Sequence, residues 1–269
     1  MHALVCMKED DRGRVAIEDL DATFCWTYGE LERLAALYAR KISSSISSEQ
    51  TSSSTCPAIS RRVAFLVDPG PEYVACTLAC WRMNTIAFPL ATMHPARELI
   101  HYLEDSACDV VVVSACYKDR VSEAIAGCAC QAALVVVEEA GLLAEHLRSH
   151  NLLPTLENEI WAAPAAEDGC LLLYTSGTTS KPKGVLHTHK SIAAQVSGLI
   201  TAWRWTCEDT ALHCLPLHHI HGIVNILYCA LASRARIVFV AKFDARRIVK
   251  KLASGDISVM MGVPTGCSY

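Results

Sequence analysis

Short apolar runs alternate with longer amphipathic segments along most of the chain. The runs are apolar at nearly every position, whereas the segments between them carry apolar residues at helical spacing. Strands that are apolar throughout are typical of parallel sheets buried on both faces. The pattern predicts strands at residues 63–67, 85–90, 109–114, 132–137 and 170–174, and helices at 72–83, 95–106 and 117–127. The predicted fold class is α/β, with doubly wound, mostly parallel sheets and flanking helices.

The N-terminal part of the chain predicts a capped helix followed by an insertion. Residues 24–42 have the pattern of a strand end and an amphipathic helix, with Thr27 placed at the N-terminus of the helix. Glu30 stands three residues later, which completes the spacing of a capping box. Residues 43–55, SSSISSEQTSSST, are rich in serine and predict a flexible insertion.

A less regular stretch interrupts the alternation. Residues 138–168 contain Pro154 and Pro164 and predict a connection between subdomains. We therefore expect a first α/β subdomain over residues 1–168 and the start of a second over 169–269. The second subdomain is predicted to contain helices at 189–204 and 245–253 and a strand at 257–261.

Composition narrows the classes of protein that the chain can belong to. Hydrophobic residues make up 52% of it and charged residues 19%, which excludes an intrinsically disordered protein. A net charge of −4 argues against nucleic acid as a partner. The apolar stretch at 222–232 is shorter than the roughly 20 residues of a membrane span. The N-terminus has no apolar run typical of a secretory signal, so we expect a cytoplasmic protein, or a mitochondrial one if a leader segment is missing.

A loop of small and hydroxylated residues gives the clearest indication of a binding site. Residues 174–185 read YTSGTTSKPKGV, and we refer to residues 175–184 as the TSGTT loop. Gly177 permits close approach of the backbone to an anion, and Lys183 supplies a positive charge. Phosphate oxygens can also accept from hydroxyl groups in the loop, which belong to Thr175, Ser176, Thr178 and Thr179. The spacing is not that of a Walker A loop, and TSGTT alone would equally suit an ordinary surface turn.

The complete string closely resembles the signature of the adenylate-forming superfamily, which includes acyl-CoA synthetases, luciferases and the adenylation domains of peptide synthetases. This resemblance implies that the TSGTT loop binds the phosphates of ATP and that Thr175 is a candidate Mg²⁺ ligand. The implied phosphate-binding residues are Thr175, Ser176, Gly177, Thr178, Thr179 and Lys183. Ser180 departs from the family, which usually has glycine there. At a position of positive φ this serine would cost about 1 kcal/mol.

A second segment, LPLHHIHG at residues 215–222, resembles another signature of the superfamily. The resemblance places His219 beside the acyl pocket and the adenylate, with His218 in place of the usual aromatic residue. A metal site is the alternative, because His213, His218, His219 and His221 are close in sequence. Against it, the segment has no cysteine or carboxylate, and adjacent histidines on an extended stretch would point to opposite sides.

Softer motifs point to one branch of the superfamily. The pairs His94-Pro95 and Trp203-x-Trp205, together with Lys242-Phe243-Asp244, look most like malonyl-CoA synthetases. The implied activity is ATP-dependent ligation of a small carboxylate to coenzyme A through an acyl-adenylate, with Mg²⁺.

The resemblance extends from about residue 24 to residue 265. The family's adenine-binding and ribose-binding motifs, and the C-terminal domain with its catalytic lysine, have no match in the 269 residues. We therefore expect an N-terminal fragment without a complete catalytic set and without activity of its own. Two alternatives stay open: a non-catalytic nucleotide-binding remnant, and an adenylation domain that passes the acyl group to another acceptor. The acyl substrate and the oligomeric state also stay open.

Overall fold

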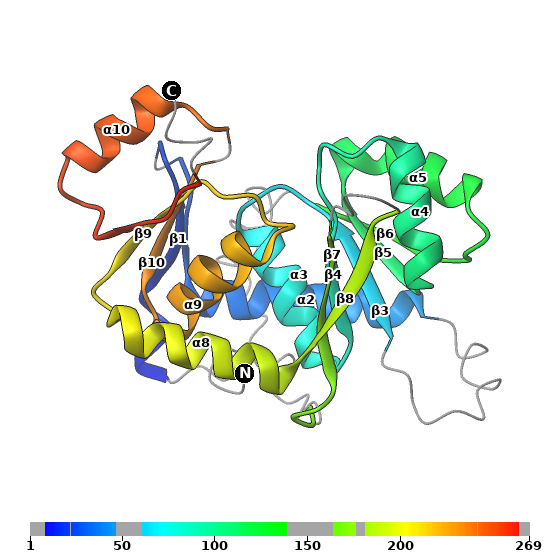
Figure 1. The fold of residues 1–269 in the computed structure, drawn as a ribbon, viewed down its shortest axis with the longest axis horizontal. Helices are drawn as coiled ribbons and strands as arrows, with labels where there is room; N and C mark the ends of the chain where they lie inside the picture. The colour runs from blue at the N-terminus through cyan, green and yellow to red at the C-terminus, as the bar shows by residue number, and fades with distance from the viewer. Residues whose placement is uncertain are drawn as a thin grey trace. The chain divides into compact units, whose positions relative to one another are not determined.

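The computed structural model describes residues 9–21, 23–46, 61–138, 164–175, 181–240 and 242–263. The chain forms two compact units, each built around one β-sheet (Figure 1). The first unit comprises Glu32–Asp68 and Glu72–Lys190, and the second comprises Met1–Leu31, Pro69–Pro71 and Ser191–Tyr269. Both sheets are mostly parallel, so the predicted α/β fold class is confirmed.

The sheet of the first unit has six strands in the order β6-β5-β3-β4-β7-β8. Every neighbouring pair is parallel except β7 and β8, which are antiparallel. After β3 the chain places β4 on one side and β5 on the other, which is a doubly wound arrangement. The strands are β3 (Arg62–Leu66), β4 (Ile86–Pro89), β5 (Val110–Ser114), β6 (Ala133–Val137), β7 (Gly169–Thr175) and β8 (Lys183–Thr188).

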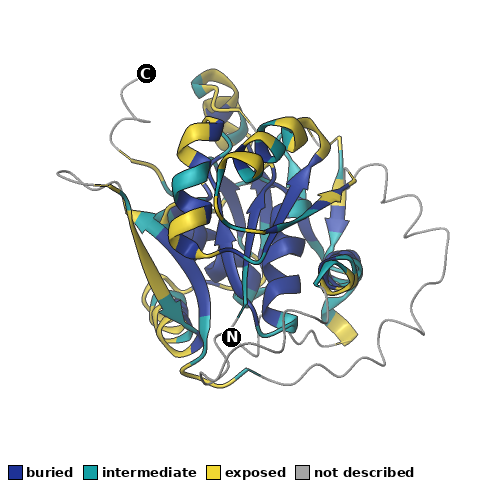
Figure 2. Cartoon of the chain, turned by 90° about the vertical axis from the view of Figure 1, so that its right-hand side faces the viewer, coloured by how far each residue is buried: buried dark blue, intermediate teal, exposed yellow. Residues whose placement is uncertain are grey.

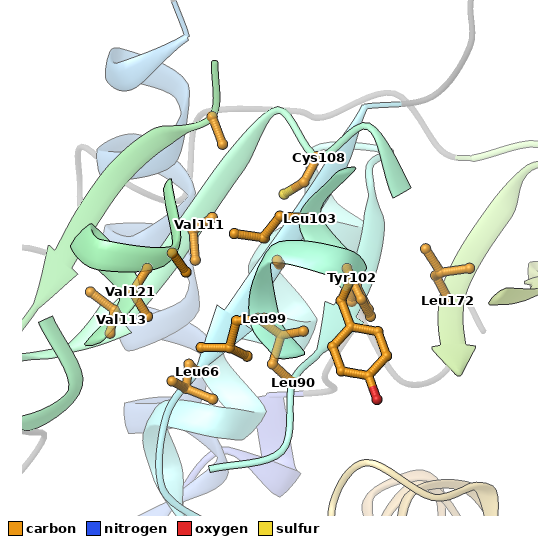
Figure 3. Close-up of a cluster of buried hydrophobic side chains, with 14 of the residues drawn as sticks. Leu66, Leu90, Leu99, Tyr102, Leu103, Cys108, Val111, Val113, Val121 and Leu172 are labelled. Atoms are coloured by element: carbon orange, nitrogen blue, oxygen red, sulfur yellow. The ribbon is translucent and has the colours of Figure 1, made fainter. Parts of the chain in front are cut away.

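Helices cover both faces of this sheet. Two helices, α4 (Ala96–Ser106) and α5 (Lys118–Gly127), pack on one face, with the short 3₁₀ helix η3 (Ala115–Tyr117) before α5. Their apolar residues and those of the strands form a buried cluster, of which Figure 3 labels Leu66, Leu90, Leu99, Tyr102, Leu103, Cys108, Val111, Val113, Val121 and Leu172. Helix α3 (Pro71–Arg82) lies on the opposite face (Figure 1). The central strands are accordingly buried, while the helices expose their outer faces (Figure 2).

The sheet of the second unit has five strands in the order β11-β9-β10-β1-β2, all parallel except β2. Its core includes Leu212, Val238 and Ile248. The strands are β1 (Val15–Asp19), β2 (Cys25–Thr27), β9 (Thr210–His213), β10 (Arg236–Phe239) and β11 (Val259–Met260). The helices of the remaining described chain are η1 (Glu9–Asp11), α2 (Tyr28–Ser45), α8 (His189–Trp203), the π-helix η4 (His221–Tyr228), α9 (Cys229–Ser233) and α10 (Ala245–Ala253).

The predicted elements lie within about two residues of the observed ones, and the capping box is confirmed. The Glu30 amide donates to Thr27 Oγ1 at 3.2 Å, and the Thr27 amide donates to Glu30 Oε2 at 2.7 Å. The predicted start of the serine-rich insertion is wrong, because α2 extends to Ser45. The hydroxyls of Ser44 and Ser45 donate to carbonyl groups of the last helical turn, which would otherwise be left without helical partners. Residues 47–55 of the insertion lie outside the described residues.

We had expected a second subdomain to begin at residue 169, but the strands there do not begin a second sheet. Both β7 and β8 belong to the sheet of the first unit, where Leu171 is buried and pairs with Ala87 of β4. Conversely, β1 lies in the sheet of the second unit, where Ile17 pairs with Ile237 of β10. Local sequence shows that such strands are buried, but it does not show which distant strand covers each edge.

Candidate functional site

The TSGTT loop connects two antiparallel strands at the edge of the first sheet. Thr175 is the last residue of β7, Lys183 is the first residue of β8, and the two are paired directly across the ladder. Thr175 Oγ1 lies 3.4 Å from the Lys183 carbonyl oxygen, to which it donates. The structure thus brings together the first and last predicted phosphate-binding residues. The other predicted residues, Ser176, Gly177, Thr178 and Thr179, and also Ser180, lie outside the described residues.

The position of the loop in the sheet suits a ligand site. Strand β7 runs parallel to β4, so the loop begins at the end of the sheet where the parallel strands have their carboxyl ends. Doubly wound sheets bind ligands at this edge. Thr175 and Lys183 are both exposed there, and they offer a hydroxyl group and an ammonium group to an anion. The strand–loop–strand connection also differs from the strand–loop–helix of a Walker A motif.

A group of aromatic and polar side chains supports the stems of the loop. The ring of Tyr174 lies 5.3 Å from that of Phe88 and 4.9 Å from that of Tyr102. Tyr174 Oη donates to Asp105 Oδ2 at 2.6 Å, and His101 Nε2 lies 3.2 Å from the Pro182 carbonyl oxygen. Burial raises the pKa of Tyr174, and the hydrogen bond to Asp105 raises it further, so the phenol stays protonated. Sequence analysis missed these contacts, and the only local signal was the spacing of His101 and Asp105 by one helical turn.

The histidine segment, residues 215–222, forms a turn that leads from β9 into the π-helix η4. His219 is exposed, and its ring centroid lies 4.2 Å from that of His218. The expectation that these two rings point to opposite sides is therefore wrong, because the segment is a turn and not an extended strand. Gly222 fits closely into the turn, since a Cβ atom there would lie 2.4 Å from the Pro216 carbonyl oxygen.

His213 is buried beneath the turn and has a structural role there. Its side chain is buried, and its Nε2 lies 2.8 Å from the Gly222 carbonyl oxygen. A carbonyl oxygen can only accept, so Nε2 carries the proton and cannot bind a metal while this hydrogen bond is present. Burial lowers the pKa of His213 from its ordinary value of 6.5 to about 4, so the ring is neutral. Among the described residues, no group of three or more His, Cys, Asp or Glu side chains could hold a metal ion.

Comparison with known proteins decides the family. The sequence model of the AMP-binding enzyme family matches residues 8–269, which is almost the whole chain. The chain belongs to this family of AMP-binding enzymes.

Its relatives within the AMP-binding family include malonate–CoA ligases. The mitochondrial malonate–CoA ligase of Mus musculus is 37% identical over 207 residues, covering 76% of this chain and 34% of the mouse enzyme. A probable CoA ligase of Humulus lupulus is 36% identical over 221 residues, covering 76% of this chain and 36% of the plant protein. The crystal structure of ATP-bound MatB from Rhodopseudomonas palustris matches with a TM-score of 0.80 and 26% identity, over 98% of this chain and 49% of MatB.

These comparisons confirm the resemblance to the adenylate-forming superfamily and to its malonyl-CoA synthetase branch. They also show that the chain spans about half the length of MatB and about a third of the curated ligases. Among the described residues of this AMP-binding protein, no helix is both long enough and apolar enough to cross a membrane.

The described residues do not by themselves form a Mg²⁺ site. Thr175 offers one hydroxyl oxygen, and that group also donates to the Lys183 carbonyl. Mg²⁺ usually takes one or two carboxylates together with phosphate oxygens of the substrate, and the described part of this AMP-binding protein has no cluster of such ligands. Thr175 remains a single candidate contact, and we assign no chemical step to the metal.

Proposed function

We propose that the 269 residues form the ATP-binding part of an acyl-CoA ligase of the malonate–CoA ligase type. The observation that carries this proposal is the pairing of Thr175 with Lys183 across the base of the TSGTT loop. This pairing lies at the carboxyl edge of a doubly wound sheet, in a chain of the AMP-binding family.

The geometry suits a triphosphate for electrostatic reasons. The Lys183 ammonium is a compact charge that can approach the terminal phosphates, while Thr175 starts a run of hydroxyl and amide donors. Because the β7–β8 ladder fixes the backbone of both residues, little reorganisation is needed when the anion binds. Hydrogen bonds between an ammonium group and phosphate oxygens are stronger than hydrogen bonds between neutral groups.

The proposed reaction has two steps. A carboxylate oxygen of the acid attacks the α-phosphorus of ATP, and the bond to pyrophosphate breaks, which gives an acyl-adenylate. The thiol sulfur of coenzyme A then attacks the acyl carbon, AMP leaves, and the thiol proton is released. The residues of this chain contribute by binding and orienting the triphosphate, so their share of the catalysis is positioning.

On the acyl side, we propose that His219 lines the pocket for the carboxylate and that malonate is the acid. The relatives named malonate–CoA ligases support the choice of acid. The exposed imidazole of His219 sits on a turn whose backbone is closely packed at Gly222.

Titration of the chain with ATP in a calorimeter tests the nucleotide site. We expect Lys183→Ala to weaken ATP binding by about 10-fold to 100-fold, because a hydrogen bond to a charged group contributes about 1.5–3 kcal/mol. Lys190→Ala is the matched control, since Lys190 is also exposed and forms its ion pair with Glu167 at 2.7 Å. Equal ATP affinity of the wild-type chain and Lys183→Ala would contradict the proposal.

A further inference from the structure

We propose that helix α4 holds both stems of the TSGTT loop and that His101 and Asp105 are positioning residues for nucleotide binding. This inference rests on the proposed function, in which the loop binds the triphosphate. It concerns residues of α4, which the loop's own sequence does not indicate.

The stem after the loop is held through Pro182. The β7–β8 ladder ends at the pair Thr175–Lys183, and Pro182 cannot extend it because proline has no amide hydrogen. The Pro182 carbonyl nevertheless has a partner, since His101 Nε2 lies 3.2 Å from it. The carbonyl can only accept, so Nε2 carries a hydrogen and donates it. His101 thus anchors the backbone one residue beyond the end of the ladder.

The stem before the loop is held through Tyr174, the residue that precedes Thr175. Its hydroxyl donates to Asp105 Oδ2 at 2.6 Å. The ring of Tyr174 crosses over Gly184, its partner in the ladder, and a Cβ atom on Gly184 would lie 3.2 Å from Tyr174 Cζ. Gly184 has no side chain and so leaves room for the Tyr174 ring, which places the hydroxyl group next to Asp105 of α4.

The two anchors come from one face of one rigid helix. His101 and Asp105 are four residues apart, so they lie one above the other on α4. The opposite face of α4 carries Leu99 and Leu103, which belong to a buried cluster that also contains Leu172 of β7 (Figure 3). This cluster holds α4 against the sheet, so His101 and Asp105 project from a supported backbone.

Anchoring both stems is expected to raise the affinity for ATP. A stem that is free to move loses conformational freedom when a ligand binds next to it, and this loss opposes binding. With His101 and Asp105 in place, part of that loss has occurred on folding, so ATP binds more tightly. Removing one anchor should therefore weaken ATP binding although neither anchor residue is proposed to touch the nucleotide.

A pair of variants at one position separates anchoring from packing. His101→Met fills similar space without a donor, whereas His101→Gln keeps an N–H donor that can reach the Pro182 carbonyl. Tyr174→Phe removes the hydroxyl of the other stem and keeps the ring. Each variant of the 269-residue chain is examined by exchange of the amide hydrogens of Lys181, Lys183 and Gly184 without nucleotide, and by ATP titration.

We expect His101→Met and Tyr174→Phe to exchange the stem amides about threefold to tenfold faster and to weaken ATP binding by a similar factor, as for the loss of one hydrogen bond. His101→Gln should stay within about twofold of the wild type on the same scale. Wild-type exchange and wild-type affinity in His101→Met would overturn the inference, as would a uniform increase of exchange throughout the first unit. If the wild-type chain binds no ATP, the proposed function fails, whereas the exchange difference between His101→Met and His101→Gln still decides whether α4 holds the stem.

Discussion

At the residue scale, His213 shows how a buried side chain links stability to pH. Its ring lies 5.1 Å from that of Phe239, and its Nε2 donates to the Gly222 carbonyl. The pKa of His213 is about 4 in the folded protein, below the ordinary value of 6.5. Between these two values the unfolded chain binds a proton that the folded chain does not, so stability falls as the pH is lowered.

We therefore predict that the free energy of unfolding decreases between about pH 6.5 and pH 4, by up to about 3 kcal/mol from His213 alone. In His213→Gln, which keeps an N–H donor, most of this dependence should disappear. A smaller slope should remain, because burial also lowers the pKa of His187 and His189. Urea unfolding at several pH values measures both curves, and parallel curves for the two proteins would show that His213 is not responsible.

At the scale of elements, the turn before η4 depends on one glycine. Gly222 is the second residue of the π-helix, and a methyl group there would lie 2.4 Å from the Pro216 carbonyl oxygen and 3.1 Å from Leu215 Cβ. The Pro216 carbonyl is part of the backbone and cannot rotate away as a flexible side chain can. The added methyl group would therefore displace the turn that carries His219.

We predict that Gly222→Ala lowers the free energy of unfolding by about 1–3 kcal/mol, as expected for overpacking. The matched control is Gly198→Ala in α8, where no atom lies within 4 Å of the added methyl group. That variant should be neutral or more stable by up to about 1 kcal/mol, because alanine favours a helix more than glycine does. Urea unfolding of both variants checks the contrast, and equal effects would mean that the turn adjusts without cost.

The elements that sequence predicted well carry their information locally. Helix α2 has its capping box at Thr27 and Glu30, and the buried strands β3 and β5 are apolar except for Arg62 and Ser114 at their ends. Strands β1, β9 and β10 were missed, because they are buried by pairing with distant segments, as Ile17 is with Ile237. The candidate site shows the same difference between local and distant information. The TSGTT string was recognisable in the sequence, whereas the contact of Tyr174 with Asp105 joins residues 69 positions apart.

At the scale of the whole molecule, the first unit is nearly continuous in sequence, whereas the second is assembled from segments that are far apart. The second sheet contains β1 and β2 from the N-terminal part of the chain beside β9, β10 and β11. The first unit carries the complete β7–β8 hairpin and the helix that holds it, so everything that we assign to phosphate binding lies in one unit. The chain corresponds to 49% of MatB, and the β7–β8 hairpin falls within the matched part.

Hydrogen exchange of the 269-residue chain, with and without ATP, tests most directly whether the TSGTT loop is the phosphate site. We predict that saturating ATP slows amide exchange in residues 175–184 and that adenosine, which has no phosphate, does not. The protection should be lost in Lys183→Ala and kept in Lys190→Ala. Exchange in residues 175–184 that ATP leaves unchanged, or that adenosine slows as much as ATP does, would contradict the assignment of the loop to the phosphates.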